Sequence, residues 1–238
     1  MTAPRQIPVF CAIDTTDLDR ASAWVRAATG AGLGLKFGKE FFAAHGPAEV
    51  RRLRPDGTPL FLDLKFHDIP NTVAGAIRAA GAAMRPDFIT VHASGGRAMI
   101  HAAREAAEAH DAGRPGILAV TVLTSLDAAD LIDQGLPGDV TRQVLRLARL
   151  AAASGADGLV SAAAEIRTLR AELPRNMSLV VPGIRPRGSA AGDQKRVMTP
   201  LEALALGADW LVIGRPITAS ADPAQAARAI AGEIGVGA

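Results

Sequence analysis

Short apolar runs alternate with longer stretches rich in alanine, arginine and glutamate along nearly the whole chain. Short runs of this kind are typical of buried strands, whereas the longer stretches have the character of amphipathic helices. The predicted strands cover residues 7–13, 32–37, 59–65, 87–92, 116–123, 157–161, 179–182 and 209–213. The predicted helices lie near residues 16–29, 40–53, 70–84, 96–111, 139–154, 163–173, 199–206 and 223–234.

Eight strand–helix units in one chain of 238 residues favour a closed parallel barrel, the TIM (β/α)8 fold. The open, doubly wound sheet is the alternative. Its dinucleotide-binding signature, G-x-G-x-x-G after the first strand, is missing, because Asp14, Thr15 and Thr16 stand there. No long linker or shift in composition divides the chain, so we expect one domain over residues 1–238.

Composition narrows the ligand. The chain is 49% hydrophobic and 21% charged, which is the balance of an ordinary globular protein. Its 26 Lys and Arg are interspersed with 24 Asp and Glu, and aromatic residues are 4% of the total, so neither a basic groove nor a stacking platform for nucleic acid is expected. A small anionic ligand fits better.

The single cysteine and the N-terminal segment indicate the cellular compartment in which the protein is expected. Cys11 has apolar neighbours and no possible partner for an intramolecular disulfide, which indicates a buried thiol in a reducing compartment. The apolar run at residues 7–13 ends at Asp14 and is too short for a signal peptide or a membrane span. We expect a cytoplasmic protein without a membrane partner.

Charged residues stand at the carboxyl ends of predicted strands, where barrel enzymes build their active sites. Asp63 and Lys65 are two residues apart and are expected to face the same side of their strand, with Lys36 on the neighbouring strand and Asp68 in the loop beyond. The alternative, purely structural interpretation is that Asp63 and Lys65 form a buried ion pair that closes the end of the barrel. Because such pairs are weak stabilisers, we interpret the array as functional.

An array of this kind suits decarboxylation. A protonated lysine can stabilise a developing carbanion and then supply the proton, while carboxylates hold its position. The sequence offers no clear ligand set for a catalytic metal, and no organic cofactor is expected.

Two loops predict a phosphate site. The loop after the seventh strand is rich in glycine and carries Arg185 and Gln194, and the eighth strand ends in Gly214 and Arg215. Barrels usually bind phosphate with these two loops. The segment at residues 92–96, H-A-S-G-G, also resembles an anion loop and receives less weight because His92 can simply bond within the barrel mouth.

The motifs D-x-K-x-x-D-I-P-N-T at residues 63–72, P-G-I-R-P at 182–186 and G-D-Q-K-R at 192–196 resemble those of the orotidine 5'-monophosphate decarboxylase family over nearly the entire chain. D-x-K-x-x-D alone is shared with sugar-phosphate decarboxylases and synthases of the same superfamily. The other motifs separate this chain from them.

The resemblance implies roles for individual residues. Lys65 is the implied proton donor, with Asp63, Asp68 and Lys36 as the other catalytic residues. The implied substrate contacts are Asp14, Lys36, Asp63, Ile69, Thr72, Thr124, Arg185, Gln194, Gly214 and Arg215. It also implies a homodimer in which Asp68 and Thr72 reach the partner's site, with orotidine 5'-monophosphate as substrate and neither metal nor cofactor.

Two alternatives stay open. A metal-assisted sugar-phosphate decarboxylase or aldolase would need magnesium and would not consume orotidine 5'-monophosphate. A non-catalytic nucleotide-binding barrel would bind UMP without turnover, although the intact Lys65 speaks against it.

Overall fold

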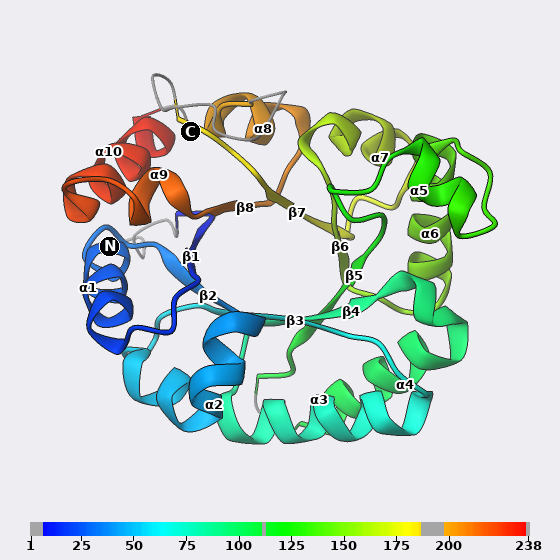
Figure 1. Ribbon diagram of the computed structural model, residues 1–238, viewed down its shortest axis with the longest axis horizontal. Helices are drawn as coiled ribbons and strands as arrows, with labels where there is room; N and C mark the ends of the chain where they lie inside the picture. Colours follow the sequence, from blue (N-terminus) through cyan, green and yellow to red (C-terminus); the bar gives the residue numbers. More distant parts are fainter. Residues whose placement is uncertain (1–6, 111–112, 187–197, 237–238) are drawn as a thin grey trace.

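Eight parallel strands close into a barrel in which each strand pairs with its neighbours in chain order (Figure 1). The computed structural model describes residues 7–110, 113–186 and 198–236. The strands are β1 (Val9–Ile13), β2 (Gly34–Gly38), β3 (Leu60–Phe66), β4 (Phe88–His92), β5 (Gly116–Val120), β6 (Gly158–Val160), β7 (Ser178–Pro182) and β8 (Trp210–Ile213). The pairing of β1 with β8 closes the ring and confirms the predicted barrel.

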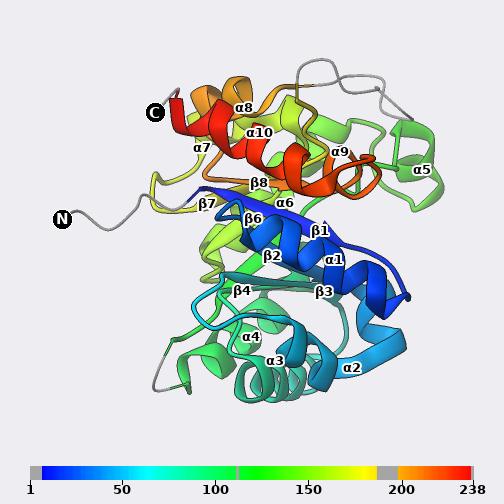
Figure 2. The ribbon, with the colours of Figure 1, turned by 90° about the vertical axis from the view of Figure 1, so that its left-hand side faces the viewer.

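Helices surround the barrel and cover its outer face (Figures 1 and 2). They are α1 (Leu18–Thr29), α2 (Lys39–Leu53), α3 (Pro70–Met84), α4 (Gly96–Glu108), α5 (Ala128–Asp133), α6 (Val140–Ala153), α7 (Ile166–Glu172), α8 (Pro200–Leu206), α9 (Arg215–Thr218) and α10 (Pro223–Val236). The short helices α5 and α9 were not predicted, because six and four residues are too few to show a helical repeat. In the described ranges no helix is both long and apolar enough to cross a membrane.

Three aspartates fasten the amino-terminal end of the barrel. Each stands just before an even-numbered strand and accepts a hydrogen bond from a backbone N–H at the start of the preceding strand. The pairs are Asp87 with Leu60 at 2.7 Å, Asp157 with Ile117 at 2.8 Å and Asp209 with Leu179 at 2.7 Å. Prediction placed these aspartates inside the strands; the observed strands begin one residue later.

Each of these aspartates also binds arginine. The ion pairs are Arg54 with Asp87, Arg104 and Arg114 with Asp157, and Arg170 with Asp209. Each carboxylate therefore links the start of its own strand to the start of the preceding strand and to an arginine from a nearby helix or loop. At a barrel end away from the strand carboxyl termini, such contacts serve stability.

Aromatic side chains fill the interior of the barrel toward its amino-terminal end. Phe10 packs against Phe61 with ring centroids 5.5 Å apart and against Trp210 at 4.8 Å. Gly34 makes room for this cluster, since a Cβ there would lie 2.7 Å from a ring carbon of Phe10. The barrel is thus a packed core and not a pore.

A larger apolar core lies between the barrel and its helices. Its outward-facing strand residues, such as Leu35, Leu62 and Ile89, are fully buried beneath the helices. Cys11 belongs to this layer, and burial raises the pKa of its thiol to about 12. The prediction of a buried thiol is confirmed.

Candidate active site

A cavity of about 350 Å³ opens at the carboxyl ends of the strands. Eight of the residues singled out in the sequence line it. They are Asp14, Lys36, Asp63, Lys65, Thr124, Arg185, Gly214 and Arg215. The fold therefore gathers residues from both halves of the chain at one place.

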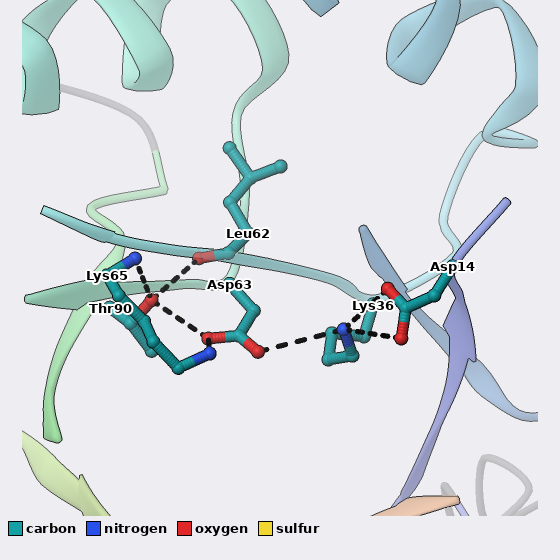
Figure 3. Close-up of polar contacts among 6 residues, drawn as sticks. All are labelled: Asp14, Lys36, Leu62, Asp63, Lys65 and Thr90. Carbon is teal, nitrogen blue, oxygen red and sulfur yellow. Dashed lines mark hydrogen bonds and ion pairs between the residues drawn. The ribbon is translucent and has the colours of Figure 1, made fainter. Parts of the chain in front are cut away.

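Four charged side chains form a continuous chain along one wall of this cavity (Figure 3). The ammonium of Lys36, on β2, lies 3.1 Å from Asp14 Oδ1 and 3.6 Å from Asp63 Oδ2. The ammonium of Lys65, on β3, lies 2.7 Å from Asp63 Oδ1. The order is carboxylate, ammonium, carboxylate, ammonium, so that every charge has an opposite neighbour.

Asp63 is the centre of this arrangement. Burial raises the pKa of its carboxyl, but the nearby charges of Lys36 and Lys65 and the hydrogen bonds from Lys65 and Thr90 outweigh burial, and the pKa is lowered overall. The carboxylate is therefore ionised at neutral pH. Only 15% of its side chain is exposed, so its two ammonium partners are screened little by water.

Lys65 lies in an irregular part of β3. The register between β3 and β4 shifts between Leu62 and Phe66, and Lys65 has a φ of 50°, in the left-handed region. Regular alternation therefore ends before Lys65, although the predicted contact between Lys65 and Asp63 forms. Strained backbone of this kind is often kept at functional sites.

Thr90, on β4, was missed by sequence reasoning. It is fully buried, and its hydroxyl contacts both the carboxylate of Asp63 and the backbone of Lys65. The available signal was its place as the one polar residue between Phe88 and Val91 in a predicted apolar strand.

The rest of the cavity has two different walls. Apolar side chains, including Phe61, Val122, Val160 and Pro182, line a surface suited to an uncharged ring. Arg185 and Arg215 bring guanidinium groups to the mouth of β7 and β8, where an anion can bind. Gln194, predicted for the same anion site, lies outside the described residues.

Three predicted site residues do not line this chain's own cavity. Asp68, Ile69 and Thr72 are exposed at the start of α3, where Asp68 Oδ1 accepts a hydrogen bond from the N–H of Ile69. Within one chain Asp68 lies outside the charged array, and its implied place in the partner's site stays a prediction. Asp14 occupies the fourth place instead, because β1 and β2 pair side by side.

His92 lies beside the array without joining it. Burial lowers the pKa of its imidazole to about 4, and electrostatic interactions with His67, Lys39 and Lys65 act in the same direction. The ring is therefore neutral at neutral pH and adds no charge to the array.

The cavity combines three chemical capacities. An ammonium beside an ionised carboxylate can stabilise a carbanion and give it a proton. An apolar wall can hold a flat ring, and two arginines can hold an anionic group. These capacities suit a small anionic substrate with a flat ring on which a carbanion forms and is then protonated.

Residues 8–230 match the family model described as "Orotidine 5'-phosphate decarboxylase / HUMPS family". The chain is 53% identical to the orotidine 5'-phosphate decarboxylase of Rhodospirillum rubrum, over 98% of this chain and 96% of that protein. It is 52% identical to the enzyme of the same name from Paramagnetospirillum magneticum, over 96% of this chain and 99% of that protein.

Solved structures agree with these sequences. The crystal structure of orotidine 5'-phosphate decarboxylase from Lactobacillus acidophilus superposes with a TM-score of 0.84 and 35% identity, covering 95% of this chain and 98% of that one. An uncharacterized conserved protein from Geobacillus kaustophilus gives a TM-score of 0.82 at 34% identity, covering 95% of this chain and 99% of that one.

Proposed function

Because this chain belongs to the orotidine 5'-phosphate decarboxylase / HUMPS family, we propose that it converts orotidine 5'-monophosphate to UMP and carbon dioxide without a cofactor. This is the last step in making UMP. The relatives at about half identity that carry the decarboxylase name favour this reaction over that of the sugar-phosphate members.

One observation carries the proposal: the Lys65 ammonium lies 2.7 Å from the ionised Asp63 inside a cavity with an apolar wall. A pyrimidine ring placed against that wall puts its C6 near this ammonium. The C6–carboxylate bond breaks, carbon dioxide leaves, and the electron pair stays on C6. A proton then passes from Lys65 Nζ to C6, which leaves Lys65 as a neutral amine.

Stabilising the C6 carbanion is the main task, since the barrier must fall by on the order of 20 kcal/mol, near the top of the enzymatic range. The ammonium of Lys65 can stabilise the carbanion without reorganisation, because Asp63, itself held by Lys36, already fixes the position of this ammonium.

Contacts far from C6 supply binding energy. Asp14 and Lys36 hold the ribose hydroxyls, and Thr124 contacts the pyrimidine. The phosphate is held by Arg185, Gly214 and Arg215 at the ends of β7 and β8, and by Gln194, which lies outside the described residues. Because C6 itself offers little to grip, this remote binding must help to close and organise the site.

The assembly proposed is a homodimer in the cytoplasm. Asp68, Ile69 and Thr72 then complete the partner's cavity. Support comes from their placement at the start of α3, where the side chain of Ile69 is 66% exposed although it is large and apolar. Such a side chain gains about 1.5–3 kcal/mol when it is buried, which favours a covered position.

The test is an ultraviolet assay of orotidine 5'-monophosphate consumption with and without EDTA, on the wild-type chain and on Lys65→Ala. We expect turnover that is insensitive to EDTA. Lys65→Ala should abolish this turnover, while its circular dichroism spectrum should remain that of a folded protein. If Lys65→Ala keeps more than about a tenth of wild-type kcat, less than roughly 1.4 kcal/mol was lost and Lys65 is not the proton donor. EDTA-sensitive activity on a sugar phosphate, with no loss of orotidine 5'-monophosphate, contradicts the function itself.

A further inference from the structure

Thr90 lies in the middle of β4, next to the array of charged side chains formed by Asp14, Lys36, Asp63 and Lys65. Its side chain is fully buried in the barrel. A buried hydroxyl costs free energy unless it is hydrogen-bonded, so its partners indicate why it stands there.

The Thr90 hydroxyl connects two catalytic groups (Figure 3). Its Oγ1 accepts a hydrogen bond from the backbone N–H of Lys65 at 2.8 Å. It lies 3.2 Å from Asp63 Oδ1 and 3.4 Å from the carbonyl oxygen of Leu62. A hydroxyl has one proton to donate, and the ionised carboxylate is both the nearer and the stronger acceptor. The proton therefore points to Asp63.

The bond from Lys65 matters because β3 is irregular there. The register shift between β3 and β4 spans Lys65, whose φ is 50°. In such a segment the N–H loses its regular partner in the sheet, and Thr90 Oγ1 replaces that partner. One side chain thus fixes the backbone of Lys65 and the carboxylate of Asp63 together.

We propose that Thr90 is a positioning residue that keeps Asp63 and Lys65 aligned while the proton is transferred, an inference that rests on the proposed function. Asp63 Oδ1 receives both the Lys65 ammonium and the Thr90 hydroxyl. When Lys65 gives its proton to C6, it becomes a neutral amine and attracts the carboxylate less. The Thr90 hydroxyl does not change its charge, so Asp63 keeps its orientation for the next turnover.

The experiment compares Thr90→Val, which has nearly the same shape without the hydroxyl, with Thr90→Ser, which keeps the hydroxyl. Because Thr90→Val removes a hydrogen bond to a charged group, its kcat should fall by about ten- to a hundred-fold. Thr90→Ser should stay within about three-fold of wild type. The dissociation constant of UMP should change little in both, because phosphate and ribose are held by other strands.

A pH profile separates positioning from a purely structural role. The hydrogen bond from Thr90 is one of the contacts that lower the pKa of Asp63 against the effect of burial. Its loss should move the acidic limb of kcat/KM to higher pH in Thr90→Val and leave it in place in Thr90→Ser. A mutation that only loosened the fold would lower the melting temperature without moving this limb.

Thr121, just after β5, provides the matched control. Its side chain is also buried, and among the described residues its hydroxyl has no hydrogen-bond partner. Thr121→Val removes the same group from the same depth and should leave kcat and the pH profile unchanged.

An active wild-type enzyme with an equally active Thr90→Val, and an unmoved acidic limb, overturns the inference alone. A wild type that does not consume orotidine 5'-monophosphate overturns the proposed function and this inference with it. If Thr90→Val does not fold, Thr90→Ala is measured in its place, with the same loss in kcat and the same shift of the acidic limb expected.

Discussion

Gly38 shows how tightly the charged side chains of the site are packed. A Cβ at this position would lie 2.7 Å from Asp14 Oδ1 and 3.1 Å from Lys36 Nζ. The absence of a side chain at the end of β2 therefore lets a carboxylate from β1 meet an ammonium from β2. Residues without chemistry of their own thus decide whether the charged ones can interact.

At the same scale, Arg215 is expected to act on the phosphate and not on the reacting carbon. Arg215→Ala should lower kcat/KM for orotidine 5'-monophosphate by about a hundred- to a thousand-fold, since charge-assisted bonds to an anion are lost. The slow reaction of orotidine, which lacks the phosphate, should barely change. Steady-state kinetics on both substrates measure the difference.

Arg228 offers a control for this experiment, because it is exposed on α10 and does not line the cavity. Arg228→Ala removes the same charge and should leave both reactions unchanged. Equal losses on both substrates in Arg215→Ala would indicate that Arg215 supports the structure instead of binding phosphate.

At the scale of elements, the aspartates before β4, β6 and β8 show how this chain separates stability from chemistry. They lie at the starts of strands, while the charged wall of the cavity lies at the strand ends. Changes at the starts are therefore expected to alter the free energy of unfolding and to leave catalysis intact.

Asp157 gives the sharpest test. Asp157→Ala leaves the N–H of Ile117 and the guanidinium groups of Arg104 and Arg114 without their shared acceptor. The free energy of unfolding should fall by about 2–4 kcal/mol, with kcat unchanged. Urea denaturation and the ultraviolet assay measure the two quantities, and a large fall in kcat with normal stability would contradict the separation.

Asp157→Asn refines this test, because its amide oxygen can still accept from the Ile117 N–H, while the charge and one of the two oxygens that accept from the arginines are lost. Burial raises the pKa of Asp157, but hydrogen bonds from Arg114, the Ile117 N–H and Arg104 outweigh it, and the pKa is lowered. The stabilisation by this charge is therefore complete above the ordinary carboxyl pKa and is lost as pH falls through the lowered one. The difference in stability between wild type and Asp157→Asn should shrink in acid accordingly.

At the scale of the whole molecule, the proposed dimer places Lys65 and Asp68 of different chains in one site. Mixing Lys65→Ala protein with Asp68→Ala protein tests this. In a mixed dimer, one site carries both defects and the other carries neither. After random exchange about half of the dimers are mixed, so about a quarter of all sites should regain activity.

Subunit exchange must be verified independently, for example by mass spectrometry of labelled chains. If exchange is complete and no activity returns, Asp68 acts within its own chain. The shared site would then be wrong, while the decarboxylase activity could still be tested through Lys65.

The sequence by itself determined the barrel and most of the site. Eight apolar runs separated by helical stretches are a local pattern, which can be recognised in the sequence before it is known which strands pair. Because barrel strands expose their carboxyl ends on one face, residues as distant as Asp14 and Arg215 could be assigned to one cavity before any contact was known.

Only the tertiary structure decided which groups touch. Asp14, and not Asp68, completes the charged array within the chain, because the pairing of β1 with β2 is non-local. The left-handed backbone of Lys65 and the place of Thr90 behind Asp63 depend on a register shift between β3 and β4. Strand pairing at this shift is set by packing across the sheet, and the residue pattern of a single strand carries no record of it.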